Sequence, residues 1–373
     1  MRILISGLAY DDGKSGISEY IQKVVEELSH HARIDLIMLE QDIGKFPVKN
    51  DAIHFIPVSN KLHKPILSML YHLYILPHKV RKWKNRYDFM FLPAGNRRIM
   101  ASYPLKTVVT IHDLSQFHIP MKYDKFRMFY ITSIIPRYLK DADVIMAVSE
   151  QTKKDLIQFY HIPESRIIVN HNGFSQEKFQ NSHPIDEVMN KYHLSKPFLL
   201  YISRIEHPGK NHLNLIKAYE HLPQEMKNKY DLVLGGSDWN GAETVHRYVE
   251  ASTAKNSIHF LGFVPNQDLK ALYEQCELYI FPSLWEGFGL SLLEAMACGA
   301  PVICSNCSSL PEVGGDAVFT FDPKDAWDIR NRIVEIMGNR DTRETMIRKG
   351  YERIKEFSWE RHAKAILELK VKN

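Results

Sequence analysis

The stretch Glu286-Gly-Phe-Gly-Leu-Ser-Leu-Leu-Glu294 lies between two apolar runs, and this combination predicts the fold of the chain. The runs 278–281 and 302–304 each have the composition of a buried strand. Between them, 290–298 is predicted to be a helix, because its residues favour helices and Gly299 suits the left-handed position after a helix end. The order strand–loop–helix–strand predicts a parallel α/β sheet. The Gly-Phe-Gly loop would then lie at its carboxyl edge, where open sheets bind ligands.

The same loop carries residues suited to phosphate. Gly287 and Gly289 lack a Cβ, so the backbone can turn sharply and approach a ligand closely. The N–H groups at the start of the following helix lie at the positive end of its dipole and suit a diphosphate. Glu286 remains in the loop, level with whatever group of the ligand is attached beyond the phosphates. Glu294 lies inside the helix and can reach a pair of ribose hydroxyls. The simpler alternative is a helix start with two solvated glutamates.

The Glu-x7-Glu pair, the glycines between, and the Ala-x-Ala-x-Gly-x-Pro-Val segment at 295–302 resemble the retaining glycosyltransferases of family 4. The whole chain is similar to this family, in particular to members that build bacterial surface polysaccharides. The resemblance implies the GT-B fold, with two Rossmann-like domains facing each other across a cleft and a C-terminal helix crossing back to the first domain. It also implies that the second domain holds a nucleotide diphosphate sugar and that the first binds the acceptor.

Length and composition agree with two domains. The 373 residues are 45% hydrophobic and 25% charged, enough for two cores. The polar stretch 175–184 is the best boundary, so we expect a domain of 1–178 with 358–373 packed on it, and a second of 179–357. The chain begins with a strand instead of a signal peptide, its longest apolar run is too short for a bilayer, and it has 4 cysteines. We therefore expect a cytoplasmic protein.

Two features of the first domain point to the donor. The loop 11–16 follows the first predicted strand, and the resemblance places Gly16 at its end near the donor phosphates or the transferred sugar. His112 ends the strand predicted for 108–112, and the resemblance gives it contact with the hydroxyls of the donor sugar. The alternative for His112 is an ordinary hydrogen-bonded core histidine.

Arg204 and Lys210 follow the strand predicted for 198–203 in the second domain. Their Arg-x5-Lys spacing resembles the family's phosphate-binding pair. A guanidinium fork and an ammonium can neutralise a diphosphate without Mg²⁺. The alternative is two solvated surface cations. The turn 262–264 resembles the family's base-contacting segment, where the backbone reads the base.

These motifs define the expected site. The predicted catalytic residues are His112, Arg204, Lys210 and Glu286. The predicted substrate-binding residues are Gly16, Gly262, Phe263, Val264, Phe288, Gly289, Leu290, Ser291 and Glu294. We expect no cofactor and no metal. Asp141-Ala-Asp143 is better explained as the start of a strand than as a metal-binding Asp-x-Asp motif, and Cys304-x2-Cys307 has no second pair with zinc-ligand spacing.

The stretch 61–106 contains ten Lys or Arg and one acid, Asp88, although the net charge of the chain is only +4. It has no nucleic-acid-binding motif, so we expect no nucleic acid partner. Within 61–86 the apolar residues fall at helical spacing with basic residues beside them. One interpretation is that this face rests on an anionic membrane surface, near a lipid-linked acceptor. The other is a helix packed on the first sheet with solvated lysines.

The predicted reaction moves a hexosyl group, with mannosyl as one candidate, from a nucleotide diphosphate sugar to a hydroxyl of a glycan or lipid-linked acceptor. We favour front-face substitution with retention, in which the leaving phosphate accepts the proton of the acceptor. A nucleophilic role for Glu286 stays open. Two alternatives are a nucleotide-sugar epimerase on the same scaffold and a non-catalytic nucleotide-sugar-binding protein. Incubation with candidate donors distinguishes transfer, isomerisation and binding without turnover.

Overall fold

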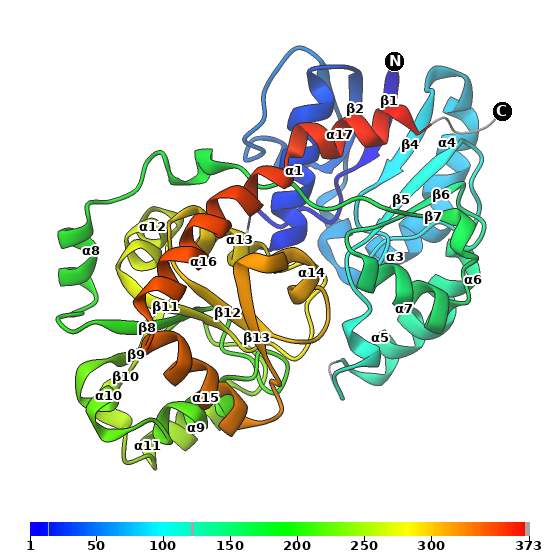
Figure 1. Cartoon of the computed structure of the whole chain (residues 1–373). Helices are drawn as coiled ribbons and strands as arrows, with labels where there is room; N and C mark the ends of the chain where they lie inside the picture. The colour runs from blue at the N-terminus through cyan, green and yellow to red at the C-terminus, as the bar shows by residue number, and fades with distance from the viewer. Residues whose placement is uncertain (14, 121–122, 370–373) are drawn as a thin grey trace. The chain divides into compact units, whose positions relative to one another are not determined.

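A computed structural model describes residues 1–13, 15–120 and 123–369 of the chain (Figure 1). The chain divides into two compact units, Met1–Gly173 with Ser358–Asn373, and Phe174–Phe357. Each unit contains one parallel sheet with helices around it, which confirms the predicted α/β architecture of two Rossmann-like domains. The boundary predicted after residue 178 falls inside a short 3-10 helix, Gln176–Phe179, which belongs to the second unit.

The described part of the first unit has a seven-stranded sheet with the order β3-β2-β1-β4-β5-β6-β7. The strands are β1 (Arg2–Ser6), β2 (Arg33–Leu39), β3 (Ile53–Val58), β4 (Phe89–Leu92), β5 (Thr107–Ile111), β6 (Val144–Ala147) and β7 (Ile167–Val169). Every neighbouring pair is parallel, and β4 and β5 are buried along their whole length. The order reverses direction between β1 and β4. In open α/β sheets this reversal opens a crevice at the carboxyl ends, where ligands bind.

Helices pack around this sheet. They are α1 (Gly16–Ser29), α2 (Glu40–Ile43), α3 (Pro65–Leu70), α4 (Leu76–Trp83), α5 (Lys125–Phe129), α6 (Ile135–Leu139), α7 (Glu150–Tyr160) and α17 (Trp359–Glu368). α1 begins after Ser15, whose hydroxyl accepts a hydrogen bond from the Ser18 N–H. Ser149 caps α7 in the same way, by accepting a hydrogen bond from the Thr152 N–H. No helix among the described residues is long and apolar enough to cross a membrane.

Two helical segments of the first unit, 65–83 and 125–139, are each interrupted by a single π-helical turn. The first turn, Tyr71–Ile75, separates α3 from α4, and the second, Tyr130–Ile134, separates α5 from α6. In each case a proline, Pro77 or Pro136, occupies the second position of the helix that follows. Proline has no N–H to donate into the preceding turn and its ring crowds the carbonyl four residues back, so the helix widens locally there.

The C-terminal helix α17 belongs to the first unit, as predicted, and runs beside α1 (Figure 1). Its first residue, Trp359, packs so closely on Gly173 that a Cβ at Gly173 would lie 2.2 Å from the Trp359 nitrogen. Further along, His362 Nε2 lies 2.9 Å from the hydroxyl of Tyr20 on α1, and its Nδ1 lies 2.8 Å from the carbonyl oxygen of His171. Helix α17 is therefore anchored by buried polar contacts as well as by apolar packing.

The described part of the second unit has a six-stranded parallel sheet with the order β10-β9-β8-β11-β12-β13. The strands are β8 (Phe198–Ile202), β9 (Asp231–Gly235), β10 (Ile258–Gly262), β11 (Cys276–Phe281), β12 (Val302–Ser305) and β13 (Val318–Phe321). Its helices are α8 (Ile185–Lys191), α9 (His212–Glu220), α10 (Gln224–Lys229), α11 (Ala242–Glu250), α12 (Asn266–Gln275), α13 (Leu290–Ala297), α14 (Leu310–Gly314), α15 (Ala326–Met337) and α16 (Arg340–Arg353). Here the strand order reverses between β8 and β11.

Candidate active site

The loops that follow β8 and β11 carry the two charged motifs of the second unit. Arg204 and Lys210 lie in the loop after β8, and Glu286 lies in the loop after β11. Because β8 and β11 are the neighbouring strands at which the sheet order reverses, both loops border the crevice expected at that point. The fold therefore brings together motifs that are more than 70 residues apart in the sequence.

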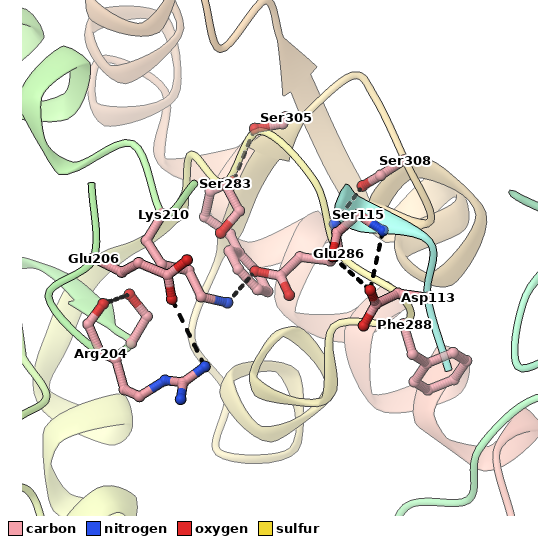
Figure 2. A network of polar contacts seen from close by, with 12 residues as sticks. Asp113, Ser115, Arg204, Glu206, Lys210, Ser283, Glu286, Phe288, Ser305 and Ser308 are labelled. Carbon is pink, nitrogen blue, oxygen red and sulfur yellow. Dashed lines mark hydrogen bonds and ion pairs between the residues drawn. The ribbon is translucent and has the colours of Figure 1, made fainter. Parts of the chain in front are cut away.

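Lys210 and Glu286 form the central ion pair of this site. Lys210 Nζ lies 2.6 Å from Glu286 Oε1, and Figure 2 shows the two side chains pointing toward each other. Both side chains are mostly shielded from solvent, with 20% and 16% of their surfaces exposed. The Tyr201 hydroxyl donates to the Lys210 carbonyl oxygen and also contacts the Ser283 hydroxyl, so one buried side chain ties together the two loops.

The Glu286 loop is held from the other side by the segment after β12. Ser308 Oγ accepts a hydrogen bond from the Glu286 N–H at 3.2 Å (Figure 2). Ser309 Oγ lies 3.1 Å from the carbonyl oxygens of both Glu286 and Phe288 and shares its proton between them. Ser308 and Ser309 thus fix the backbone that carries Glu286. The residues from 310 onward form helix α14.

Arg204 is the more exposed of the two predicted phosphate-binding cations. About half of its side-chain surface is accessible, and Arg204 Nη2 lies 3.7 Å from Glu206 Oε2. The guanidinium also lies over the ring of Trp239, 4.9 Å from the ring centre. One acid and one aromatic face orient this guanidinium while leaving donors available to a ligand.

Helix α13 begins at the glycine of the predicted phosphate loop. Gly289 precedes Leu290 and Ser291 with φ +98°, which favours glycine, and no side chain caps the helix start. A Cβ at Gly289 would lie 2.7 Å from Leu310 Cδ2, so the packing also requires glycine. The ring of Phe288 is buried edge-on against Phe357, so only its backbone can face a ligand. At the other end Gly299 has φ +77°, as predicted.

Glu294 lies within α13 and is buried. Lys178 Nζ forms an ion pair with Glu294 Oε1, and the Tyr273 hydroxyl donates to Glu294 Oε2 at 3.1 Å. Burial, and secondly the charge of Glu294, raises the pKa of Tyr273, which keeps its hydroxyl a donor. Each carboxylate oxygen therefore has one protein donor and retains a lone pair for a ligand hydroxyl.

The turn predicted to contact the base follows β10. Gly262 has φ +67°, and nothing lies within 4 Å of the position that a Cβ would occupy. Phe263 is the most exposed large apolar side chain described, at 73%, whereas Val264 is buried. An exposed aromatic ring beside open backbone suits stacking on a flat ligand.

In the first unit, His112 lies directly after β5 and is buried. Its Nε2 lies 2.7 Å from the carbonyl oxygen of Pro93, and its ring packs edge-on against Tyr20 with 4.7 Å between ring centres. Burial lowers the pKa of His112 to about 4, so the imidazole is neutral at physiological pH. With Nε2 donating to Pro93, Nδ1 is the acceptor. Gly16 begins α1, and an added Cβ there would meet nothing within 4 Å. Lys14 of the same loop lies outside the described residues.

Two of the residues considered for metal binding, Asp143 and Cys307, make hydrogen bonds to the backbone. Asp143 accepts a hydrogen bond from the Thr107 N–H at 2.8 Å, so it joins β5 to the segment before β6. Cys304 is buried, and the Cys307 thiol donates to the Leu284 carbonyl oxygen. Among residues 1–13, 15–120 and 123–369, no group of three or more His, Cys, Asp or Glu side chains converges as metal ligands would.

Three contacts in this site are not predictable from the spacing of the sequence motifs. Lys178 and Tyr273 reach Glu294 from 116 and 21 residues away, and Ser309 reaches Glu286 from 23 residues away. Lys178 stands in a polar stretch that resembles a linker and gives no local signal.

Comparison with known proteins agrees with this architecture. Residues 14–178 match the family model described as Glycosyltransferase Family 4, and residues 185–353 match the one described as Glycosyl transferases group 1. O-antigen chain mannosyltransferase B of Escherichia coli is 36% identical over 258 residues, which cover 68% of this chain and 67% of that protein. Serotype-specific mannosyltransferases WbdA of E. coli are 36–37% identical, but the match spans only 29–30% of their length.

Solved structures show the same fold at lower identity. Sucrose-phosphate synthase from Thermosynechococcus elongatus superposes with a TM-score of 0.76 at 19% identity, covering 99% of this chain and 98% of that one. HepE of Anabaena, solved in complex with UDP and glucose, gives a TM-score of 0.74 at 18% identity with the same coverage. The fold and the loops at its two strand reversals define a glycosyltransferase of the GT-B type. The chain belongs to glycosyltransferase family 4.

Proposed function

We propose that the protein transfers a mannosyl group from a nucleotide diphosphate mannose to a hydroxyl of a glycan or lipid-linked acceptor, in the synthesis of a bacterial surface polysaccharide. The observation that carries this proposal is the Lys210–Glu286 pair at the strand reversal of the second sheet, with Arg204 in the same loop as Lys210. The donor sugar is inferred from relatives named as mannosyltransferases. The kind of acceptor is inferred from a relative whose name specifies a diphospho-undecaprenol-linked glycan.

The charges suggest how the donor would react. Lys210 and Arg204 would stabilise the negative charge that develops on the leaving diphosphate. Glu286 would lie beside the anomeric carbon and stabilise its positive character. The bond between the anomeric carbon and the phosphate oxygen breaks, the acceptor oxygen bonds to the same face of that carbon, and the acceptor proton moves to the leaving phosphate. The product then keeps the anomeric configuration of the donor, and no metal ion is needed.

His112 would position the sugar and would not act as a base. Its Nε2 lies against the Pro93 carbonyl oxygen, and burial lowers its pKa to about 4. A neutral imidazole in this tautomer presents Nδ1 as an acceptor for a sugar hydroxyl. Glu294, with Lys178 and Tyr273 on its two oxygens, would accept hydrogen bonds from the two ribose hydroxyls.

A donor screen tests the proposal against its alternatives. Thermal shifts with GDP-mannose, UDP-glucose and the corresponding nucleotides would identify the donor, because a ligand stabilises the folded state it binds. Incubation of that donor with a glycan acceptor should then yield a lengthened glycan. An isomerised sugar would indicate an epimerase, and a thermal shift without turnover would indicate a binding protein.

The segment 61–84, which contains α3 and α4, packs on the sheet with one face and suits contact with a membrane on the other. Leu73, Leu76 and Val80 are buried in the core of the first unit. On the other face, large apolar side chains are exposed, and they include Ile66, Leu67, Leu70, Tyr74 and Ile75. Exposed cations of the same segment include Lys61, Lys64, Arg81, Lys82 and Lys84. An exposed apolar face bordered by cations suits the surface of an anionic bilayer.

Vesicle co-sedimentation tests this contact. Binding to phosphatidylglycerol vesicles should fall as salt is raised, and should also fall when Arg81, Lys82 and Lys84 are changed to Ser. Changing Ile66 and Leu70 to Ser should weaken the salt-resistant part of the binding. Equal sedimentation with phosphatidylcholine, or none with either lipid, would leave the packed helix as the only role of this segment.

A further inference from the structure

Arg98 is a shielded cation that the proposed reaction does not use. It lies in the loop after β4, and its Nη1 donates to the Arg97 carbonyl oxygen at 2.9 Å. Its Nε is buried and has no hydrogen-bond partner in the described parts of the chain, and neither has the buried Oδ1 of Asn96. No Asp or Glu within residues 1–13, 15–120 and 123–369 forms an ion pair with Arg98.

The surroundings of Arg98 add positive charge. Burial above all, together with the charges of Arg97 and Arg127, lowers the pKa of Arg98 to about 10, although the phenol of Tyr130 acts in the opposite direction. The guanidinium therefore stays charged at neutral pH. A shielded guanidinium without a carboxylate partner is costly, and in folded proteins such a charge is normally paired. The partner expected here is an anion that the chain itself does not supply.

Arg97 extends the same positive region toward the neighbouring loop. One third of its side-chain surface is exposed, and its Nη1 lies 3.9 Å from Asp11 Oδ2 in the loop between β1 and α1. Arg97 and Arg98 thus lie after β4, beside the loop that follows β1, and β1 and β4 are the strands at which the first sheet reverses its order. This is the crevice at which open sheets bind ligands.

The loop that carries the two arginines is fixed. The Gly95 N–H donates to the Thr110 carbonyl oxygen at 2.8 Å, and a Cβ at Gly95 would lie 2.2 Å from Val109 Cγ1. The Pro93 carbonyl oxygen is the partner of His112 Nε2 at 2.7 Å. An anion held by Arg97 and Arg98 would therefore lie within one short loop of the histidine assigned to the sugar.

We propose that Arg97 and Arg98 form a binding site for a phosphate or diphosphate group, and that this group belongs to the acceptor. The assignment to the acceptor rests on the proposed transferase function. A guanidinium edge offers two parallel N–H donors that match two oxygens of a phosphate, and Arg98 has its Nε–H unused on that edge. Two adjacent guanidinium groups match the oxygens of a diphosphate better than they match the two oxygens of a single carboxylate. Another source of the same chemistry is free phosphate or pyrophosphate from solution.

A binding measurement tests the site without an acceptor. Inorganic pyrophosphate would also bind the phosphate site of the second unit, so the full chain carrying Arg204→Ala and Lys210→Ala is the background. Calorimetry in this background should detect pyrophosphate binding, and adding Arg98→Gln or Arg97→Gln should weaken it about tenfold or more, as loss of a charge-assisted hydrogen bond does. Arg33→Gln removes the same charge from the amino end of β2, at the opposite edge of the sheet, and should change nothing. Absence of pyrophosphate binding, or binding that none of these changes affects, overturns the site.

Kinetics identify the source of the phosphate. The same acceptor saccharide is compared on a neutral alkyl chain and on an alkyl diphosphate. The ratio of kcat/KM for the diphosphate acceptor to that for the neutral one should fall at least about tenfold in Arg98→Gln and stay unchanged in Arg33→Gln. An unchanged ratio in Arg98→Gln, with pyrophosphate binding still lost, would show that the site takes free phosphate and would overturn the acceptor assignment. A wild-type protein without transfer to either acceptor contradicts the proposed function, whereas the pyrophosphate measurement still decides whether the site exists.

Discussion

Lys210 Nζ lies 2.6 Å from Glu286 Oε1, and this ion pair joins the loop after β8 to the loop after β11. Each partner orients the other before any substrate binds, because the short contact fixes both the ammonium and the carboxylate. A diphosphate that arrived at Lys210 would share this cation with Glu286. The pair therefore holds in advance the two charges that a departing phosphate and a developing oxocarbenium-like centre would need.

Removing either phosphate-binding cation should slow transfer strongly. We expect Arg204→Ala and Lys210→Ala each to cost about 2–4 kcal/mol in transition-state stabilisation, measured as kcat/KM, because a preorganised charge is lost. Lys196→Ala is a matched control: Lys196 pairs with Asp231, at the first residue of β9 and thus at the opposite edge of the sheet. A similar loss in the control would indicate a general effect of charge on the fold.

Glu286→Gln should lower kcat by several orders of magnitude, with a modest effect on the Kd of the nucleoside diphosphate. The double variant with Lys210→Ala should be far from additive, because the two side chains contact each other. Kinetics of the two single variants and the double variant measure this coupling. Additive losses would mean that Glu286 and Lys210 act independently, contrary to the mechanism.

Glu294→Ala should weaken binding of the nucleotide more than it slows the bound donor, since ribose contacts persist in the ground and transition states alike. Lys178→Met and Tyr273→Phe should each have a smaller effect in the same direction, because they orient the Glu294 carboxylate from its two oxygens. Calorimetric titration with nucleotide checks all three. The ribose assignment is wrong if nucleotide affinity is unchanged in Glu294→Ala while turnover at saturating donor collapses.

Four buried histidines predict that acid destabilises the fold. Burial lowers the pKa of His72 and His212 to about 3, and of His112 and His362 to about 4. Each is neutral in the folded chain and gains a proton on unfolding below its ordinary pKa of about 6.5. The stability that these groups contribute is therefore present above pH 6.5 and is lost progressively toward pH 4.

The size of this effect can be tested at His72. Because the pKa of His72 in the folded chain is about 3, lowering the pH from 6.5 to 5 should reduce the free energy of unfolding by about 2 kcal/mol. His72→Asn should lower stability at pH 7.5 and reduce the pH slope by about that amount, whereas His31→Asn at an exposed position should leave the slope unchanged. Urea unfolding at the two pH values measures it. A slope that His72→Asn does not alter would mean that His72 gains its proton in the folded state.

Most strands and the main charged motifs were predictable because they depend on local pattern. Buried parallel strands are short apolar runs, and the Gly289 and Gly299 positions follow from backbone conformations that favour glycine. Strand β3 was missed because Pro57 interrupts its pattern, and the sheet tolerates that proline because β3 is an edge strand. The π-helical turns before Pro77 and Pro136 also escaped, since periodicity does not reveal one extra residue per turn.

The contacts around the site residues could not be predicted in the same way. Lys178 meets Glu294, and Ser309 meets the Glu286 backbone, only after separate strands have been placed side by side. In the sequence Arg98 is one of many cations in a basic stretch, and it is distinguished only by its buried Nε, which has no hydrogen-bond partner among the described residues. Which residues carry charge is visible in the sequence, but what surrounds each charge is a property of the folded chain.

The most direct test of the proposed reaction is the anomeric configuration of the product, measured by NMR on a glycan lengthened from an α-linked nucleotide diphosphate mannose in the presence of EDTA. Front-face substitution by the acceptor hydroxyl, with Lys210, Arg204 and Glu286 stabilising the charges that develop, predicts an α-linked mannosyl product and a rate that chelation does not change. A β-linked product would contradict retention. A reaction abolished by EDTA and restored by Mn²⁺ would contradict the role given to the two cations.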